Sequence, residues 1–227
     1  MFALRFVSYF AIMVGALTIL FEFGPLIISE YDYQRDRLFG IHHVIEPNIV
    51  TSSGTAVENA TPKASGSNGF GSATAGEIPI TPVSTDFGIV IEKINANSKV
   101  IPDVDPANES EYTAALKQGV AEAKGSTPPG QPGNLYIFSH STDAPWDVIR
   151  YNAVFYLLRD LDAGDRVIIF YQGRRYDYIV YDKHIIDPTD LTYLNNRYDK
   201  PVLTLQTCDP PGTLSHRLIV RAKLESS

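Results

Sequence analysis

Short runs of β-branched and aromatic residues alternate with turn residues from Asp86 to the carboxyl terminus. The clearest runs read FGIVIEKI, NLYIFSH, RVIIFYQG, YDYIVYDKHI, PVLTLQTC and RLIVRAKL. Short strands at this spacing, with Gly and Pro between them, are typical of a closed or sandwiched β architecture. The segment Tyr171-Gln-Gly-Arg-Arg-Tyr176 predicts a tight turn between two runs, and hence a hairpin. The pattern therefore predicts a mainly β domain over residues 86–227.

Two segments of this region have a helical period instead. Glu109–Ala123 carries apolar residues at three- and four-residue spacing and ends at Lys124-Gly125, which predicts a helix with a glycine stop. Asn152–Leu161 has the same spacing and is followed by the turn Asp162-Ala-Gly-Asp165. We expect two or three short helices beside the strands, and about 140 residues are enough for a single core.

The amino-terminal segment Phe6–Ser29 is apolar apart from Glu22 and a few hydroxyls. A bilayer-spanning helix needs about 20 such residues, so the pattern predicts one transmembrane helix within residues 1–29. Arg5 precedes the run and Glu30 follows it, which places the amino terminus in the cytoplasm. A cleaved signal peptide and a buried core helix are the alternatives. The first lacks a good small-residue cleavage site, and the second would be shorter.

Residues 30–85 separate this helix from the β domain. Within them, Thr51–Glu77 consists mostly of Ser, Thr, Gly, Ala and Asn, with almost no large apolar side chains. Such a chain cannot bury enough surface to offset its ordering entropy. We therefore expect a juxtamembrane segment and a flexible linker.

Composition narrows the classes of function. Hydrophobic residues make up 44% of the chain, which is a globular value. The net charge of −7 argues against tight nucleic-acid binding, which needs a basic field. A single cysteine excludes an internal disulfide and a multi-cysteine metal site.

That cysteine, Cys208, ends an apolar run and is followed at once by a proline-containing loop. A cysteine at the mouth of a strand can be reached by a ligand, although a small buried hydrophobe is the commoner fate. A nucleophilic cysteine needs a base. His140 has the same placement at a strand end, whereas His184 and His216 are equally compatible with the surface.

A strand arginine beside a thiolate can hold an oxyanion. Arg217 and Arg221 are both candidates, because their spacing of four puts them on one face of the last strand.

These residues carry a resemblance to a known family. Leu203-Thr-Leu-Gln-Thr-Cys208, a short loop and Arg217-Leu-Ile-Val resemble the carboxy-terminal signature of sortases, the membrane-anchored cysteine transpeptidases of bacterial surfaces. Gly133-Asn-Leu-Tyr-Ile-Phe-Ser-His140 is similar to their histidine strand, with Ser139 where the family has Gly. The similarity covers roughly Asp86–Glu225 and the anchor.

The resemblance implies a closed eight-stranded sortase-like β-barrel in which three side chains converge. Cys208 would be the nucleophile, His140 the general acid and base, and Arg217 the oxyanion and substrate stabiliser. It further implies a substrate groove that covers the apolar part of the sorting motif. We expect the groove to include Thr207, Ser141, Ile186 and Leu191.

The implied activity is cleavage of a motif similar to Leu-Pro-x-Thr-Gly and transfer of the acyl group to an amine. Implied partners are motif-bearing surface proteins, an amine acceptor on a cell-wall precursor or another protein, and the membrane. The implied location is the bacterial cell membrane, with the catalytic domain extracytoplasmic. A thiol peptidase that only hydrolyses and a catalytically silent peptide-binding barrel remain alternatives.

Two family features are expected to be missing. Some sortases bind calcium through acidic residues before the histidine strand, but Lys124–Gly133 has none and only Glu122 lies nearby. We therefore expect no cofactor and no calcium requirement. Pilin polymerases often carry an Asp-Pro-aromatic lid and a second membrane span, and neither is found in the sequence. The expectation is a general-purpose, single-anchor sortase.

Overall fold

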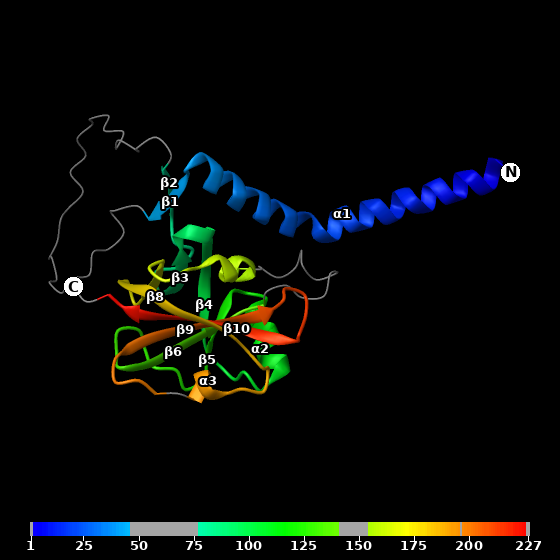
Figure 1. The fold of residues 1–227 in the computed structure, drawn as a ribbon. Helices are drawn as coiled ribbons and strands as arrows, with labels where there is room; N and C mark the ends of the chain where they lie inside the picture. The colour runs from blue at the N-terminus through cyan, green and yellow to red at the C-terminus, as the bar shows by residue number, and fades with distance from the viewer. Residues whose placement is uncertain (1, 46–76, 141–153, 196, 226–227) are drawn as a thin grey trace.

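The computed structural model describes residues 2–45, 77–140, 154–195 and 197–225, and its centre is a closed eight-stranded β-barrel (Figure 1). The strands follow one another around the barrel in the order β10-β8-β7-β3-β4-β5-β6-β9, with β9 pairing β10 to close it. They are β3 (Phe87–Ile91), β4 (Ala96–Val104), β5 (Val120–Ala123), β6 (Gly133–Phe138), β7 (Arg166–Tyr171), β8 (Arg174–Ile186), β9 (Pro201–Asp209) and β10 (His216–Leu224). The predicted mainly β, eight-stranded barrel is confirmed.

Strand direction around the barrel is mixed. β4 pairs β5 and β6 pairs β9 in parallel, while the other neighbours are antiparallel. The β7–β8 hairpin lies where the sequence predicts it. Its turn residues Gln172 and Gly173 have φ of 51° and 73°, the left-handed values that a tight two-residue hairpin turn requires.

Alternate residues of each strand fill the barrel. Leu135 and Ile137 of β6, Leu203 and Leu205 of β9, and Leu218 of β10 belong to one buried cluster. Because side chains alternate across a strand, the residues between them point to the outer face. On β9 these are Thr204, Gln206 and Cys208.

The helices outside the barrel are short. They are α2 (Glu109–Leu116), α3 (Thr192–Asn195), and the 3-10 turns η1 (Glu92–Ile94) and η2 (Tyr156–Asp160). The helix predicted over Glu109–Ala123 is too long, because its last four residues form β5 instead. Val120 and Ala121 pair with β4, and Ala121 also pairs with β6, so closure of the barrel overrides the local helical period. Of the helix predicted over Asn152–Leu161, the structure describes residues 154–161, and Tyr156–Asp160 of these form the 3-10 turn η2.

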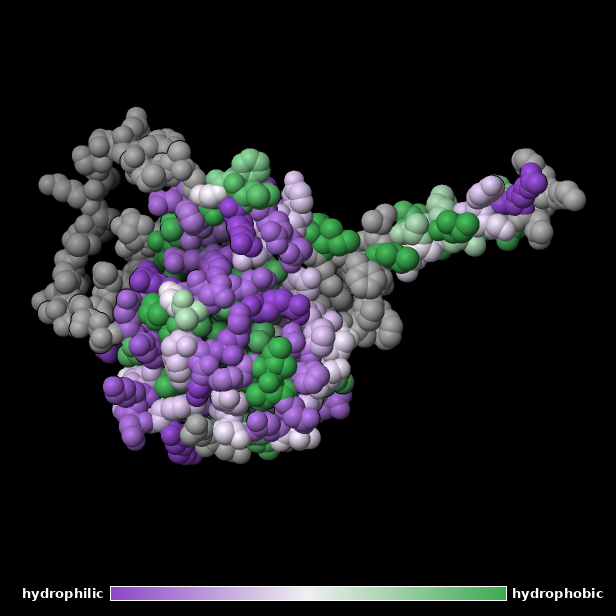
Figure 2. Space-filling model, viewed as in Figure 1, coloured by the Kyte–Doolittle hydropathy of each residue, from purple (hydrophilic) through white to green (hydrophobic). Residues whose placement is uncertain are grey.

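A long helix, α1 (Phe2–Phe39), precedes the barrel and extends away from it (Figure 1). Apolar side chains such as Phe6, Phe10 and Leu17 are exposed along its described part (Figure 2). The sequence predicts that this segment spans a membrane. Among the residues that the structure describes, however, no helix combines the length and the apolar character needed to cross a bilayer, so the predicted transmembrane helix is not supported.

The segment after α1 attaches to the barrel through a two-stranded parallel sheet, β1 (His42–Ile45) with β2 (Glu77–Ile80). Ile45 and Ile80 pack on residues of β3 and β7, among them Phe170. β3 is four places from β9 in the ring of strands, so this attachment covers the side of the barrel away from Cys208. Most of the predicted linker, residues 46–76, lies outside the described part of the chain.

Candidate active site

Cys208 and Arg217 are cross-strand neighbours. Cys208 lies near the end of β9 and Arg217 near the start of β10, and the antiparallel register pairs the two residues directly. Residues paired in this way have Cβ atoms about 4.5–5.5 Å apart and point to the same face. Both side chains are half-buried on the outer face of the barrel.

His140 follows β6, the other neighbour of β9. The parallel register runs from Gly133 opposite Pro201 to Phe138 opposite Gln206, and Ser139 continues it by donating its N–H to the Gln206 carbonyl at 3.1 Å. Continuing this parallel register by two residues beyond the Phe138–Gln206 pair places His140 opposite Cys208. His140 is half-buried. The three predicted residues thus come from the same end of three neighbouring strands.

Arg217 and Arg221 have different surroundings. Arg217 donates through Nη1 to the carbonyls of Leu214 at 3.3 Å and His216 at 3.1 Å. Within the described residues, no carboxylate lies within ion-pair distance of its guanidinium. Its charge therefore remains available to a ligand beside Cys208.

Arg221 is held in a polar cluster further along β10. It pairs opposite Thr204 on one side and Asp182 on the other, and its guanidinium forms an ion pair with the Asp182 carboxylate. It also donates to the Tyr198 hydroxyl at 3.2 Å and lies 5.2 Å from the centroids of the Tyr181 and Tyr193 rings. Arg221 therefore ties the connection between β8 and β9 to the barrel wall.

That connection, residues 187–200, borders the outer face of β9. It begins after Ile186, which pairs opposite Arg217. Exposed apolar side chains surround this end of the barrel: Ile185 is 61% exposed, Leu191 54% and Leu214 75%. Exposed apolar side chains next to the polar residues Cys208 and Arg217 suit a ligand that has both an apolar part and a polar part.

A second set of contacts holds the middle of the connection. Asn134 of β6 donates its side-chain N–H to the Tyr193 carbonyl in α3 at 2.9 Å. Buried Thr204 donates in turn to the Asn134 side-chain carbonyl at 2.8 Å. The connection is thus fixed to both β6 and β9.

Tyr136 and Gln206 lie between this contact and the catalytic end. The Tyr136 hydroxyl donates to the Gln206 side-chain carbonyl. Burial raises the pKa of Tyr136, while the positive charge of Arg217 acts in the opposite direction. Tyr136 therefore stays protonated and acts as a hydrogen-bond donor on the outer face.

One predicted groove residue, Thr207, does not take that place in the structure. Thr207 is 3% exposed and lies on the inward face of β9, between Leu205 and the end of the strand, so its side chain cannot line an outer groove. The hydroxyl is buried and forms no hydrogen bond within the described residues. Ser141 lies outside the described residues.

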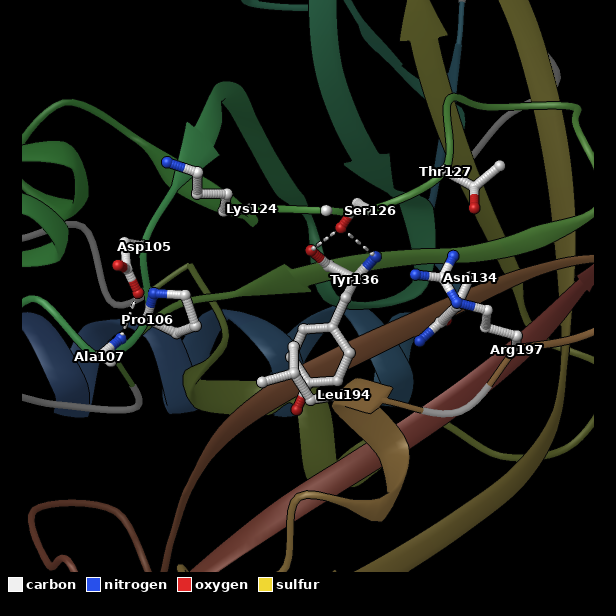
Figure 3. A pocket seen from close by; sticks show the side chains of 11 residues that line it. Asp105, Pro106, Ala107, Lys124, Ser126, Thr127, Asn134, Tyr136, Leu194 and Arg197 are labelled. Carbon is white, nitrogen blue, oxygen red and sulfur yellow. Dashed lines mark hydrogen bonds between the residues drawn. The ribbon is translucent and has the colours of Figure 1, made fainter.

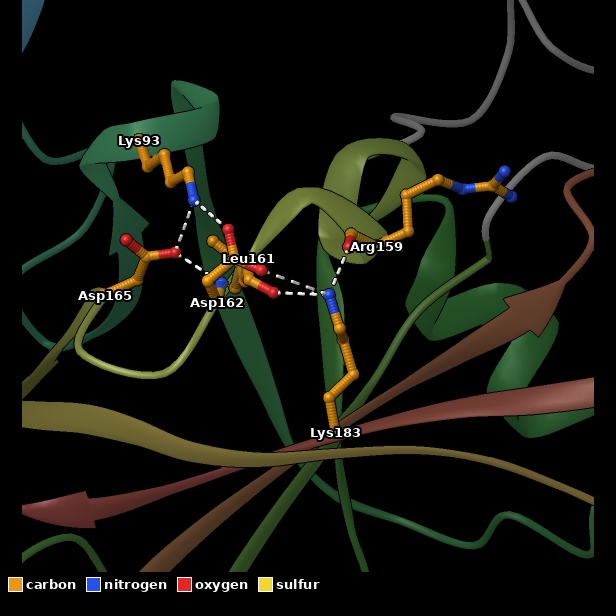
Figure 4. A network of polar contacts seen from close by, with 6 residues as sticks. All are labelled: Lys93, Arg159, Leu161, Asp162, Asp165 and Lys183. Carbon is orange, nitrogen blue, oxygen red and sulfur yellow. Dashed lines mark hydrogen bonds and ion pairs between the residues drawn. The ribbon is translucent and has the colours of Figure 1, made fainter.

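A polar network that sequence reasoning missed supports the end of β9. Asp209 follows Cys208 and forms an ion pair with Arg159 of η2 at 3.1 Å. Lys183 of β8 donates to the carbonyls of Arg159 and Leu161, each at 2.6 Å (Figure 4). The network therefore fixes η2, and through Arg159 it reaches the residue beside the nucleophile. No sequence signal links partners 50 residues apart.

Lys93 extends this network toward η1. It donates to Asp162 at 3.0 Å and to Asp165 at 2.8 Å (Figure 4). Burial would lower the pKa of Lys93, but the hydrogen bonds to both carboxylates raise it. Lys93 therefore remains charged and holds the turn that follows η2.

The described residues contain no group of three His, Cys, Asp or Glu side chains placed to hold a metal ion. Glu122 is the acidic residue that precedes the loop before β6 in the sequence. Burial raises its pKa, although its carboxylate accepts a hydrogen bond from the Asp103 N–H at 3.3 Å. Its carboxylate is thus bound to the backbone of β4.

Comparison with known proteins identifies the family to which this chain belongs. A family model described as a sortase domain matches residues 89–225. The chain is similar to a Clostridium perfringens Sortase D5 transpeptidase, with 25% identity, a TM-score of 0.51, and coverage of 62% of this chain and 79% of that one. Comparison with curated proteins gave no match.

Two further solved structures give the same picture. Sortase A from Corynebacterium diphtheriae is 28% identical with a TM-score of 0.53, and the match covers 63% of this chain and 61% of that one, less than two thirds of its length. Streptococcus agalactiae sortase C1 is 26% identical with a TM-score of 0.52, covering 62% and 67%. The similar structures carry three different class letters, so the likeness resolves no subclass.

Proposed function

This chain belongs to the sortase family of cysteine transpeptidases, and from that premise we propose that it cleaves an LPxTG-like sorting motif and transfers the acyl part to an amine. The observation that carries the proposal is the cross-strand pairing of Cys208 with Arg217, next to the strand that ends at His140. This arrangement supplies a nucleophile, a cation and an acid–base group at one end of the outer face.

In the proposed first step, the Cys208 thiolate attacks the carbonyl carbon of the motif threonine. The negative charge that develops on the carbonyl oxygen is stabilised by the Arg217 guanidinium. Collapse of the tetrahedral intermediate breaks the carbon–nitrogen bond, and His140 donates a proton to the departing glycine amine. The product is a thioester on Cys208.

In the second step, an acceptor amine attacks the thioester carbonyl carbon. His140, now neutral, accepts the proton that the amine loses, and the Cys208 thiolate leaves. If water takes the place of the amine, the same steps give hydrolysis. The proposal favours transfer, with hydrolysis as the alternative outcome of a missing acceptor.

We propose that the apolar residues of the motif lie against the β8–β9 connection. Ile186 shares the outer face with Arg217, and Leu191 is exposed in the connection. Arg221 and Asn134 hold this connection in place, so the groove is formed before the substrate arrives.

A proposed location follows from the substrates. Sorting-motif proteins and their acceptors meet at the bacterial surface, so we place the catalytic domain outside the cytoplasmic membrane. The apolar segment of residues 6–29 would attach it, with the amino terminus on the cytoplasmic side. Protease treatment of intact cells, followed by membrane fractionation, tests this placement: a catalytic domain shielded from the protease would contradict it.

The function itself is tested by mass spectrometry. The protein is incubated with an LPxTG-containing peptide, with and without triglycine as the amine. We expect cleavage between Thr and Gly, a thioester-bound intermediate on Cys208, and a transfer product only when triglycine is present. Cys208→Ala is the matched control, since it removes the sulfur at a half-buried position.

Three results would count against the proposal. Cleavage by folded Cys208→Ala refutes the nucleophile. Hydrolysis without transfer at saturating amine supports the peptidase alternative. Peptide binding without any cleavage supports a catalytically silent barrel.

A further inference from the structure

A hollow opens on the outer face of the barrel, near the start of β6, whereas Cys208 and His140 lie toward the end of that strand (Figure 3). Its volume is about 360 Å³. The lining comes from four parts of the chain: the β4–α2 connection, the β5–β6 connection, β6 itself and the β8–β9 connection. Its main residues are Lys124, Ser126, Asn134, Tyr136, Leu194 and Arg197.

The walls of this pocket are fixed by hydrogen bonds. Ser126 bonds both backbone groups of Tyr136, accepting from its N–H at 3.1 Å and donating to its carbonyl at 3.4 Å (Figure 3). Asn134 donates a hydrogen bond to the Tyr193 carbonyl, which fixes α3 and with it the lining residue Leu194. The pocket is therefore a permanent feature of the face and does not depend on a ligand to form it.

The lining is cationic although the chain as a whole is acidic. Lys124 and Arg197 contribute two positive charges, while Asp105 is the one carboxylate among the lining residues. Asp105 already accepts a hydrogen bond from the Ala107 N–H at 2.9 Å. Neither cation forms an ion pair with a carboxylate in the part of the chain that the structure describes. The net charge of the chain is −7, so a local positive excess marks this pocket as a site for an anionic group.

The strand register gives the separation between this pocket and Cys208. Asn134 pairs opposite Val202 on β9, and Cys208 lies six residues further along that strand. At about 3.3 Å per residue, the separation is roughly 20 Å. The β8–β9 connection borders both ends of this path, since it starts beside Arg217 and returns to Pro201 opposite Gly133.

An extended peptide has the same rise per residue. With the motif threonine at Cys208, the residue that reaches the pocket is about six positions toward the amino terminus. The motif Leu-Pro-x-Thr accounts for only four residues on that side of the scissile bond. The pocket therefore faces residues that precede the motif.

We propose that this pocket is a subsite for the two or three residues immediately before the sorting motif, and that Lys124 and Arg197 select an acidic side chain there. The proposal rests on the proposed function, because it needs a peptide with its scissile bond at Cys208. Its substrate class is a surface protein with Asp or Glu just before the motif.

The test compares three peptides that differ only in the residue two positions before the motif, which is Glu, Gln or Lys. A second set places the same three residues three positions before it. We expect wild-type kcat/KM for at least one set to follow the order Glu, Gln, Lys, with Glu about two- to fivefold above Lys, the range of a solvent-exposed ion pair. The preference should weaken as salt is raised.

Charge reversal gives the decisive comparison. In Lys124→Glu/Arg197→Glu, the peptide preference should change to Lys above Glu. Arg174→Glu is the control for charge reversal away from the pocket: it reverses one cation, half the charge change of the double variant, at an exposed position of the β7–β8 hairpin and should keep the wild-type order.

The outcomes separate the two proposals. Equal cleavage of all peptides by the wild type, or a Glu preference that survives the double variant, overturns the subsite and leaves the proposed function standing. Failure of the wild type to cleave any of the peptides overturns the proposed function, and the subsite with it.

Discussion

Arg217 lies directly opposite Cys208 across the β9–β10 pair, whereas Arg221 lies opposite Thr204 and is bound to Asp182. The two arginines share one face of one strand. Their contacts nevertheless indicate different roles. Arg217 contacts backbone carbonyls of its own turn and faces the candidate nucleophile, while Arg221 connects the strand to the aromatic rings of the β8–β9 connection.

Substitution of the two arginines should therefore give different results. Arg217→Ala is expected to lower kcat/KM for the sorting peptide by about 10²- to 10³-fold, because one oxyanion donor is lost. Its melting temperature should change little, since Arg217 is half-buried and, among the described residues, its side chain donates only to the nearby Leu214 and His216 carbonyls. Arg221→Ala is expected to destabilise the fold by about 1–3 kcal/mol, because the partly buried Asp182 carboxylate loses its main partner.

Peptide cleavage kinetics and thermal unfolding measured on both variants check this difference. Arg217→Lys is the conservative control. It keeps the charge but loses the planar donor geometry, so only partial activity should return. Equal losses of turnover in Arg217→Ala and Arg221→Ala would contradict the assignment.

The sequence predicts much of this fold because the relevant signals are local. Alternating apolar residues identify β6, β7, β8, β9 and β10, and the ends of β6 and β9 identify His140 and Cys208 as candidates. The Gln172-Gly173 turn is likewise predicted from residues next to one another. Each of these inferences uses only a few consecutive positions.

The failures concern properties that depend on distant partners. Val120 has a helical spacing from Tyr112 and Leu116, yet it forms a strand, because β4 pairs with it and β6 pairs with the next residue, Ala121. Thr207 adjoins Cys208 in the sequence but faces the interior of the barrel. Strand alternation alone leaves Arg217 and Arg221 equivalent, and only the family resemblance chooses Arg217, because the strand register that distinguishes their partners is not contained in a local pattern.

The Arg159–Asp209 pair is expected to control the reactivity of the neighbouring thiol. Arg159→Ala leaves the Asp209 carboxylate uncompensated next to Cys208, and a negative charge disfavours thiolate formation. The pH midpoint of alkylation by iodoacetamide should move upward. A shift of about half a pH unit is expected, because Arg159 is partly exposed and its field is screened.

Asp209→Asn provides the control for this shift. In an Arg159→Ala/Asp209→Asn double variant, the carboxylate is gone and the alkylation midpoint should return toward the wild-type value. A shift that persists in the double variant would mean that the Arg159 side chain acts through the position of η2 and not through charge.

Catalysis is expected to be independent of calcium. The β5–β6 connection begins with Lys124 and supplies no carboxylate, and Glu122 is bonded to the Asp103 backbone. A calcium site needs six to eight oxygen ligands. The fixed β8–β9 connection also leaves no ordering step for a metal to perform.

The rate of sorting-peptide cleavage should therefore be the same in excess EGTA and in millimolar CaCl₂, within about 20%, a margin smaller than the effect of a single exposed ion pair. Strontium and magnesium salts at matched ionic strength control for screening of the cationic pocket. Activation by calcium alone would contradict this expectation and would require ligands from residues outside the described part of the chain.

The Asp182–Arg221 ion pair should make the stability of the barrel sensitive to acid. Burial would raise the pKa of Asp182, but hydrogen bonds from Arg221 and His184 and their charges outweigh burial and hold it below its usual value. A carboxyl with a lowered pKa in the folded state stabilises the fold above its unfolded pKa of about 3.9, and this stabilisation is lost as pH falls through the folded value. Wild type should therefore melt at a higher temperature than Asp182→Asn at pH 7, and the difference should shrink between about pH 4 and pH 2.

Thermal unfolding of both proteins, followed by circular dichroism at several pH values, measures this difference in melting temperature. A gap between the two proteins that stays constant down to pH 2 would show that Asp182 contributes through shape or neutral hydrogen bonding and not through its charge.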